Sequence, residues 1–180
     1  MPLDSTKPGL SVPVSERDHA IGPADAPVTL VEYGDYECPD CGNAYPEIKR
    51  LIGECGSRLR FVFRSFPQHS IHPRAGVAAM AAEAAAAQGK FWEMHDLLYQ
   101  HQQELADLDL THLALGLGLE VYRFESDLQS AAAARRIRAD FASGLESGVT
   151  GTPTFFINGC RYDGPPEVEP LLAALEAADR

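Results

Sequence analysis

Two cysteines three residues apart have the spacing of a redox-active pair. Cys38 and Cys41 enclose a Pro-Asp dipeptide and follow the apolar run 28–31, which has the residues of a β-strand. Sequence compatible with a helix continues over residues 42–52. Two cysteines on the first turn of a helix can close a small disulfide, and the first lies where free backbone N–H groups and the helix dipole favour a thiolate. The pattern indicates that Cys38 attacks and Cys41 resolves in thiol–disulfide exchange.

The four cysteines leave other uses open. Zinc sites usually combine two close pairs of ligands, whereas only Cys38 and Cys41 are close here, so we expect no metal and keep metal binding as an alternative. A disulfide scaffold would be a shorter chain with denser cysteines. Cys55 is expected to be a buried thiol at a helix end, and Cys160 a more exposed thiol after a hairpin. A disulfide between these two stays open, because sequence spacing does not fix their distance.

Strand and helix patterns alternate around the pair. Residues 28–33 are predicted as a strand, 39–55 as a helix that Pro46 should kink, and 58–66 as a second strand. A crossover of this length predicts parallel pairing of the two strands. A loose arm, 1–26, precedes them, with a short strand possible near residues 19–21.

The middle of the chain has almost no strand signal. Residues 73–147 are rich in alanine and read as an inserted helical domain between two parts of an α/β domain, 27–72 and 148–180. The second part begins with a strand at 153–157 and an Asn-Gly hairpin turn. The remaining elements are helices at 73–88, 90–102, 109–117, 120–129 and 131–146, a returning strand at 160–162 and a final amphipathic helix at 167–178.

Composition limits the classes of partner. Hydrophobic residues make up 45% of the 180 residues and charged residues 23%, as in soluble globular proteins. The net charge of −11 argues against nucleic acid, and no apolar run approaches the ~20 residues of a membrane span. The first twenty residues lack the apolar core of a secretory signal, so a cytoplasmic protein is expected if the chain is complete. No pattern specifies an oligomeric state.

Several motifs in this order resemble the DsbA-like thiol–disulfide oxidoreductases of the thioredoxin superfamily, over about residues 27–178. The resemblance implies an α/β thioredoxin fold with an inserted all-helical domain. It also implies a dithiol that exchanges disulfides with protein or small-molecule thiols and with an unknown redox partner, and that needs no cofactor. The motifs are Glu32 six residues before Cys38, the Cys-Pro-Asp-Cys tetrapeptide, Pro46, the Gly-Thr-Pro-Thr run 151–154 and the segment 91–99 (FWEMHDLLY).

The resemblance gives four further residues and Glu32 a place in the site. It implies that the Thr152–Pro153 bond is cis and lies beside the dithiol, where the Thr152 backbone pairs with an extended substrate, with Pro39 and Asp40 also in contact with substrate. Glu32 would be buried beneath the disulfide and accept the proton of the resolving thiol. The residues alone also allow a trans proline that opens an edge strand, and a Glu32 that points to solvent.

Asp40 departs from the histidine of the most oxidising family members. A carboxylate does not stabilise a neighbouring thiolate, so we expect a Cys38 pKa above that of the strongest oxidants and a couple in the more reducing half of roughly −120 to −270 mV. Phe91 and Trp92 are expected in the core, with contact to the dithiol groove as the alternative. His69 and His72 are expected at helix caps or on the surface, with proximity to Cys38 as the alternative.

Two other function classes stay open at this stage. The same groove could serve a chaperone-like binding module in which the cysteines are incidental. The fold could also belong to a glutathione-dependent isomerase or transferase, for which dependence on glutathione is the discriminating observation.

Overall fold

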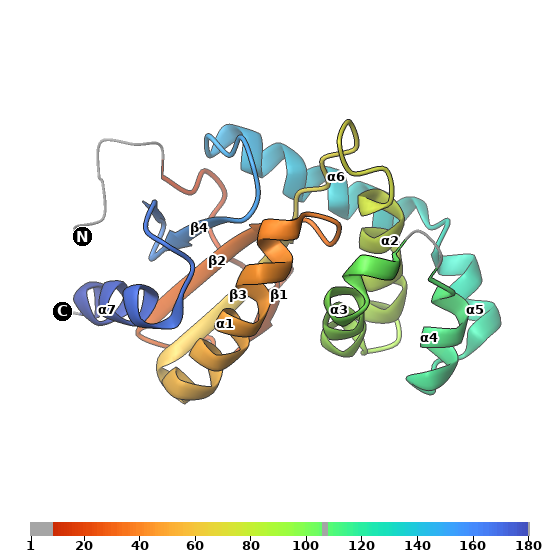
Figure 1. Cartoon of the computed structure of the whole chain (residues 1–180), viewed down its shortest axis with the longest axis horizontal. Coiled ribbons are helices and arrows are strands. Elements are labelled where there is room, and N and C mark those ends of the chain that lie inside the picture. Colours follow the sequence, from red (N-terminus) through yellow and green to blue (C-terminus); the bar gives the residue numbers. More distant parts are fainter. Residues whose placement is uncertain (1–8, 106–107, 180) are drawn as a thin grey trace.

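The structure is a computed structural model that describes residues 9–105 and 108–179. Its centre is a five-stranded sheet in the order β1-β3-β2-β4-β5 (Figure 1). β2 and β3 are parallel, as predicted, and the other neighbouring pairs are antiparallel. The strands are β1 (His19–Ile21), β2 (Val28–Gly34), β3 (Leu59–Ser65), β4 (Thr154–Ile157) and β5 (Cys160–Tyr162).

Alternation along β2 sends its side chains to two apolar layers. Leu30 packs with residues of α1 (Pro39–Cys55), α3 (Phe91–Gln100) and α7 (Val168–Ala178). Val31 and Tyr33 pack on the opposite face, against Phe66 and Phe141 among others. Because successive strand residues point to opposite faces, Glu32 lies on the face that carries Leu30. The central strand thus places Glu32 beneath α1, the helix that carries the cysteines.

Helix α1 continues past its internal proline. Pro46 lies inside the helix, which runs to Cys55 as predicted, with Ala44, Ile48 and Leu51 buried on one side. These positions are spaced as an amphipathic helix requires. The apolar stripe fixes the rotation of α1 on the sheet and therefore the direction in which its first turn faces.

The helical segment follows β3 in the chain and precedes β4. Figure 1 shows α6 returning from the outer helices to the sheet, and α6 contacts β3. The helices predicted for this segment agree with the structure to within a few residues. They are α2 (Ala75–Ala86), α3, α4 (Leu110–Gly116), α5 (Val121–Asp127) and α6 (Ala131–Glu146), with a 3₁₀ turn at Gln102–Glu104.

The β4–β5 hairpin follows the local prediction. Asn158 and Gly159 have φ values of 47° and 80°. A two-residue turn with positive φ at both positions suits asparagine and glycine and matches the twist of the paired strands. This hairpin places β4, with Pro153 before it, directly beside β2.

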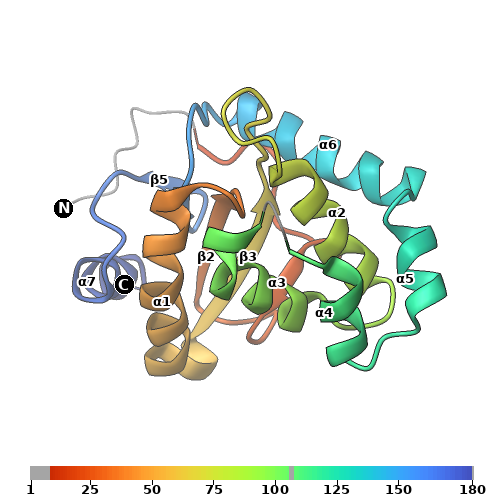
Figure 2. The same ribbon diagram turned by 45° about the vertical axis from the view of Figure 1, so that its right-hand side comes forward.

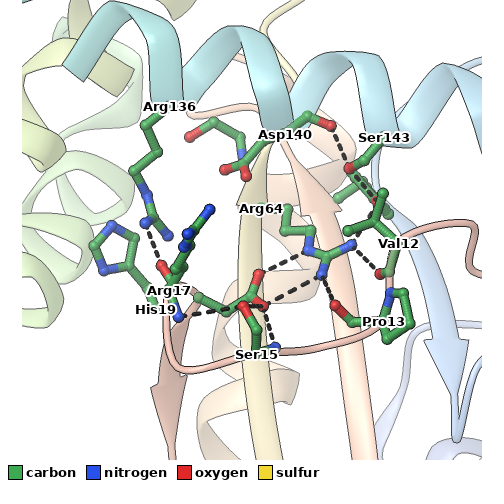
Figure 3. Close-up of polar contacts among 12 residues, drawn as sticks. Val12, Pro13, Ser15, Arg17, His19, Arg64, Arg136, Asp140 and Ser143 are labelled. Carbon is green, nitrogen blue, oxygen red and sulfur yellow. Dashed lines mark hydrogen bonds and ion pairs between the residues drawn. The ribbon is translucent and has the colours of Figure 1, made fainter. Parts of the chain in front are cut away.

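The expectation of a loose arm is wrong for residues 9–26. Arg64 of β3 donates to the carbonyl oxygens of Val12 (2.9 Å) and Pro13 (3.3 Å), as Figure 3 shows. The Nε atom of Arg64 donates to the Asp18 carboxylate (2.8 Å). Burial raises the pKa of Asp18, but the hydrogen bonds from Arg64 and Ser15 outweigh it and leave that pKa below its ordinary value. A buried guanidinium needs acceptors, and this segment supplies them. Residues 1–8 of the predicted arm lie outside the described residues.

A second polar contact connects the helical segment to the sheet. Glu83 of α2 is buried and pairs with His19 of β1 (2.9 Å) and with Arg136 of α6 (3.0 Å). Figure 2 shows α2 and α6 lying side by side. Glu83 therefore ties α2 and α6 to the edge strand β1.

Candidate active site

Cys38 is the residue that precedes the first turn of α1. Its backbone is extended, with φ −70° and ψ 120°, and its side chain is 5% exposed, whereas Cys41 on the first turn is fully buried. Both are free thiols in the structure. The Cys38 Sγ atom lies 3.2 Å from the carbonyl oxygen of Thr152, which accepts a hydrogen bond from the protonated form of the thiol. The less buried of the two cysteines is therefore the one next to the loop before β4.

The surroundings of the two thiols shift their pKa values in opposite directions. A hydrogen bond from the Cys41 thiol, which outweighs burial, together with the backbone N–H groups of Cys41 and Asp40, lowers the pKa of Cys38 to about 5. Burial, the hydrogen bond to Cys38 and the charge of Glu32 raise the pKa of Cys41 well above its usual range. At neutral pH the pair therefore consists of one thiolate and one thiol.

Glu32 lies in the interior below the two sulfurs. Glu32 is only 4% exposed, so the alternative in which its side chain points to solvent is wrong. Burial, followed by the negative charge on Cys38, raises the pKa of Glu32 to about 8. A carboxyl with this pKa can both accept and release a proton near neutral pH.

A groove opens beside the dithiol on the β4–β5 side. Its volume is about 410 Å³, and Asp40, Thr152, Pro153 and Tyr162 contribute to its lining. The Thr152–Pro153 peptide bond is cis. Three of the four residues expected to contact substrate thus border one groove. Pro39 is exposed on the first turn of α1 and is not among the lining residues.

Gln102 forms hydrogen bonds with the backbone around Cys38, a role that the sequence did not predict. Gln102 donates from its side-chain amide to the carbonyl oxygens of Cys38 (2.8 Å) and Tyr36 (2.9 Å). These acceptors precede or begin the first turn of α1. A lone glutamine in a polar stretch gives no signal in the sequence, because its partners are more than sixty residues away along the chain.

Asp35 organises the other side of the same loop. Its buried carboxylate accepts from the backbone N–H groups of Glu37 (2.8 Å) and Gln68 (2.9 Å) and contacts His72 Nδ1 at 2.8 Å. Gln68 in turn donates to the Thr152 hydroxyl (2.9 Å). His72 is therefore not a helix cap or a plain surface residue, as first expected, because it pairs with the loop before Cys38. His69 is exposed, as expected.

The remaining candidates lie away from the groove. Phe91 is buried in the core, and the half-buried Trp92 packs against Phe61 with ring centroids 5.8 Å apart. Cys55 is buried, Cys160 is half-buried, and both are free thiols. Over residues 9–105 and 108–179, no group of three or more His, Cys, Asp or Glu side chains is arranged to hold a metal ion.

The chain matches proteins of known sequence. It is 50% identical over 170 residues to the Na⁺/H⁺ antiporter NhaA 3 of Salinispora tropica, a match that covers 94% of this chain and 26% of the antiporter. The chain thus spans about a quarter of the length of the curated relatives it matches. Within its described part, no helix is both long and apolar enough to cross a bilayer.

Solved structures share its architecture over nearly the whole chain. A thioredoxin-like oxidoreductase from Silicibacter pomeroyi DSS-3 is 27% identical with a TM-score of 0.79, over 91% of this chain and 93% of that one. The alpha-DsbA1 protein of Wolbachia pipientis is 20% identical with a TM-score of 0.79, over 94% of each chain.

A family model supports the same assignment from sequence. The model described as thioredoxin matches residues 14–177, which include the dithiol, the helical segment and the β4–β5 hairpin. With this match, the α/β architecture and the likeness to alpha-DsbA1, the chain belongs to the thioredoxin family and has the thioredoxin fold of its DsbA-like members.

Proposed function

We propose that the protein is a thiol–disulfide oxidoreductase that works through Cys38 and Cys41. The observation that supports this most strongly is the opposite shift of the two thiol pKa values. Cys38, whose sulfur lies 3.2 Å from the carbonyl oxygen of Thr152, has a pKa of about 5, while the pKa of the buried Cys41 lies well above its usual range. A nucleophilic thiolate beside a protonated neighbour is the arrangement that exchange through a mixed disulfide requires.

In the reductive direction, the Cys38 thiolate attacks one sulfur of a substrate disulfide. A bond forms between Cys38 Sγ and that sulfur, and the second substrate sulfur leaves as a thiolate. The Glu32 carboxylate then accepts the proton of Cys41. The Cys41 thiolate attacks Cys38 Sγ, the mixed disulfide breaks, and the first substrate sulfur leaves as a thiolate. Two electrons pass from the dithiol to the substrate, and the reverse sequence oxidises a substrate dithiol.

We propose that the substrate is an extended segment carrying a thiol or disulfide and that it lies in the groove. Thr152, Pro153 and Asp40 all contribute to the lining of the groove. The backbone before Pro153 is close to the reactive sulfur, since the Thr152 carbonyl oxygen lies 3.2 Å from it. A segment paired with this backbone would present its own sulfur to Cys38.

Reduction of insulin and refolding of a scrambled disulfide substrate test the function directly. We expect the purified protein to catalyse at least one of these reactions without added metal or cofactor. Catalysis only in the presence of glutathione would favour an isomerase or transferase instead. Full activity on unfolded chains after loss of Cys38 would favour a chaperone-like binding module.

Asp40 should set the reduction potential of the pair. Replacing Asp40 with histidine adds a partly cationic group beside Cys38, which lowers the pKa of that thiol and stabilises the reduced form. We expect Asp40→His to raise the potential by on the order of 30 mV or more, because this corresponds to about 1.4 kcal/mol for a two-electron couple. Equilibration with glutathione measures the shift. A wild-type potential near −120 mV would contradict the expected reducing couple.

The direction of electron flow follows from the surroundings of the protein. If the protein acts in a reducing compartment, the dithiol form would predominate and favour reduction or isomerisation over net oxidation. The name of the antiporter relatives refers to proteins about four times as long, of which this chain matches 26%, and Na⁺/H⁺ antiport is not part of the proposal.

A further inference from the structure

The carbonyl oxygen of Cys38 accepts two hydrogen bonds, one from its own helix and one from the helical segment. The Gly42 N–H group donates to it at 3.1 Å, which is the first α-helical hydrogen bond of α1. The Gln102 side-chain amide donates to it at 2.8 Å and to the Tyr36 carbonyl oxygen at 2.9 Å. A carboxamide nitrogen has two hydrogens, so these two carbonyl oxygens use both. Gln102 thus binds one peptide group before Cys38 and the one that follows it.

The position of Gln102 is itself fixed by the core. Gln102 lies in the 3₁₀ turn that follows α3, and its carbonyl oxygen accepts from the N–H group of Leu105 (3.4 Å), a residue buried in the same core cluster as α1 and α3. The Leu105 carbonyl oxygen accepts from Arg74 Nε (3.3 Å), and the backbone N–H group of Arg74 donates to the Glu37 carboxylate (2.5 Å). The helical segment therefore contacts the chain around Cys38 through two residues, Gln102 and Arg74.

These contacts determine the orientation of the Cys38 backbone. Cys38 is extended, with φ −70° and ψ 120°, and directly precedes the first turn of α1. Because ψ sets the direction of a residue's own carbonyl group, a bound Cys38 carbonyl oxygen fixes how the sulfur lies relative to that turn. The Cys41 thiol and, after it, the backbone N–H groups of Cys41 and Asp40 lower the pKa of Cys38 by hydrogen bonding to the sulfur. Hydrogen bonds weaken steeply with misalignment, so this stabilisation depends on the orientation.

Gly42 leaves the space that the Gln102 amide occupies. A Cβ atom on Gly42 would overlap with Gln102 Oε1, and the next nearest atoms beyond the backbone of α1 are Cδ and Nε2 of the same side chain. The φ angle of Gly42 is not among the positive ones, so its backbone conformation is open to alanine. Alanine is also the better helix former, so α1 alone gives no reason for glycine here. The contact with Gln102 gives one.

We propose that Gln102, for which Gly42 leaves space, positions Cys38 for reaction, and that through this contact the helical segment sets the reactivity and the reduction potential of the dithiol. The inference rests on the proposed function, because it concerns the attacking sulfur of the same pair. Gln102 binds backbone oxygens and not the sulfur, so it is a positioning residue. Loss of the contact lets the Cys38 carbonyl group turn, weakens the hydrogen bonds to the thiolate and destabilises the reduced form relative to the disulfide.

The substitutions that test this role change no charge. Glutamine, glycine and alanine are neutral. The titratable groups that interact with Cys38 are Glu32 of β2 and Cys41 of α1, and Glu37 and Asp40 lie close to it along the chain. All four stay in place in the variants. A shift in the ionisation of Cys38 would therefore report a change in its orientation and hydrogen bonding.

The pH dependence of Cys38 alkylation and the equilibrium of the dithiol with glutathione are the two measurements. We expect Gln102→Ala to raise the alkylation midpoint by about one pH unit, an effect comparable with the loss of one hydrogen bond to a charged group. The equilibrium with glutathione should move about tenfold toward the disulfide, which corresponds to a potential lower by about 30 mV. Gln103→Ala is the matched control, because Gln103 is an exposed glutamine in the same turn, and it should change neither value.

Gly42→Ala approaches the same contact from the other side. Its new methyl group displaces the Gln102 amide, so we expect both shifts again. In the Gln102→Ala background the space is already empty, and Gly42→Ala should add no further shift. Gly53→Ala is the control for this variant, because Gly53 lies in the same helix and a Cβ atom there meets no atom within 4 Å beyond the helix backbone. It should leave the alkylation midpoint and the potential unchanged.

Several outcomes would overturn the positioning role. One is a lower unfolding midpoint for Gln102→Ala with an unchanged alkylation midpoint and potential, which would make the contact merely structural. Others are an unshifted Gly42→Ala, or equal shifts from Gly42→Ala with and without Gln102. Failure of the wild type to reduce insulin or refold a scrambled substrate would overturn the proposed function alone, since alkylation and equilibration with glutathione need no turnover. An active wild type whose Gln102→Ala variant shows neither shift would overturn the positioning role alone.

Discussion

Replacing Cys38 with serine abolishes disulfide exchange, and replacing Cys41 with serine leaves the mixed disulfide trapped. A serine hydroxyl is not ionised at neutral pH, so we expect insulin reduction by Cys38→Ser to fall by more than about a thousandfold. Cys41→Ser retains the attacking sulfur and lacks the one that displaces the substrate. Mass spectrometry after reaction with a small disulfide should therefore find an adduct on Cys38 in that variant.

Cys55→Ser is the control for both variants. Cys55 is a buried free cysteine at the opposite end of the same helix, so its replacement tests whether loss of a buried thiol alone affects catalysis. We expect unchanged turnover for this variant. An active Cys38→Ser protein, or an adduct that forms on Cys41 in the wild type, would reverse the assignment of the two sulfurs.

Replacing Glu32 with glutamine should slow resolution about a hundredfold at neutral pH and leave attack by Cys38 intact. Part of the raised pKa of Glu32 comes from the charge on Cys38. The mixed disulfide removes that charge, so the pKa of Glu32 falls and the carboxylate becomes available as a base. The wild-type rate of resolution should rise with pH as Glu32 ionises. Glutamine accepts no proton, so this rise should be absent from the variant, as rapid-mixing kinetics over pH would show.

Unfolding experiments give a second test of Glu32. Its folded-state pKa of about 8 is raised from an ordinary 4.5, so the folded protein retains a proton that the unfolded chain releases. This destabilises the wild type increasingly between those two pH values, and Glu32→Gln should be the more stable protein by a margin that grows over that range. Glu83→Gln, which alters a buried carboxylate with two ion pairs, should lose stability and resolve mixed disulfides normally. A constant margin for Glu32→Gln would contradict the raised pKa.

Local patterns predicted most of the scaffold. Three elements could be predicted because residues close together in the sequence determine them. They are the apolar strand β2, the amphipathic helix α1 and the turn at Asn158 and Gly159, and the structure contains all three. The parallel β2–β3 pair followed from the length of the crossover between the strands. The burial of Glu32 was favoured by the resemblance and left open by its own neighbours, because alternation along a strand does not show which faces are covered.

The polar contacts around the dithiol could not be predicted from the sequence. Gln102 and Cys38 are separated by 64 residues, and Asp35 and His72 by 37. Neither pair has a local spacing that marks it. The contacts between Arg64 and the N-terminal segment were missed for the same reason. Arg64 lies in a strand that alternates apolar and basic residues, and this local pattern does not show that Asp18 and the Val12 carbonyl oxygen accept its hydrogen bonds.

The pH dependence of Cys38 alkylation shows directly whether Cys38 is the reactive thiolate of the pair. Iodoacetamide reacts with thiolates, so the rate should rise with pH as Cys38 ionises, and peptide mapping assigns the modified residue. We expect a half-maximal rate near pH 5 on Cys38, with Cys41 unmodified throughout the neutral range. A midpoint near the ordinary thiol pKa of about 8.5, or equal modification of both cysteines, would contradict it.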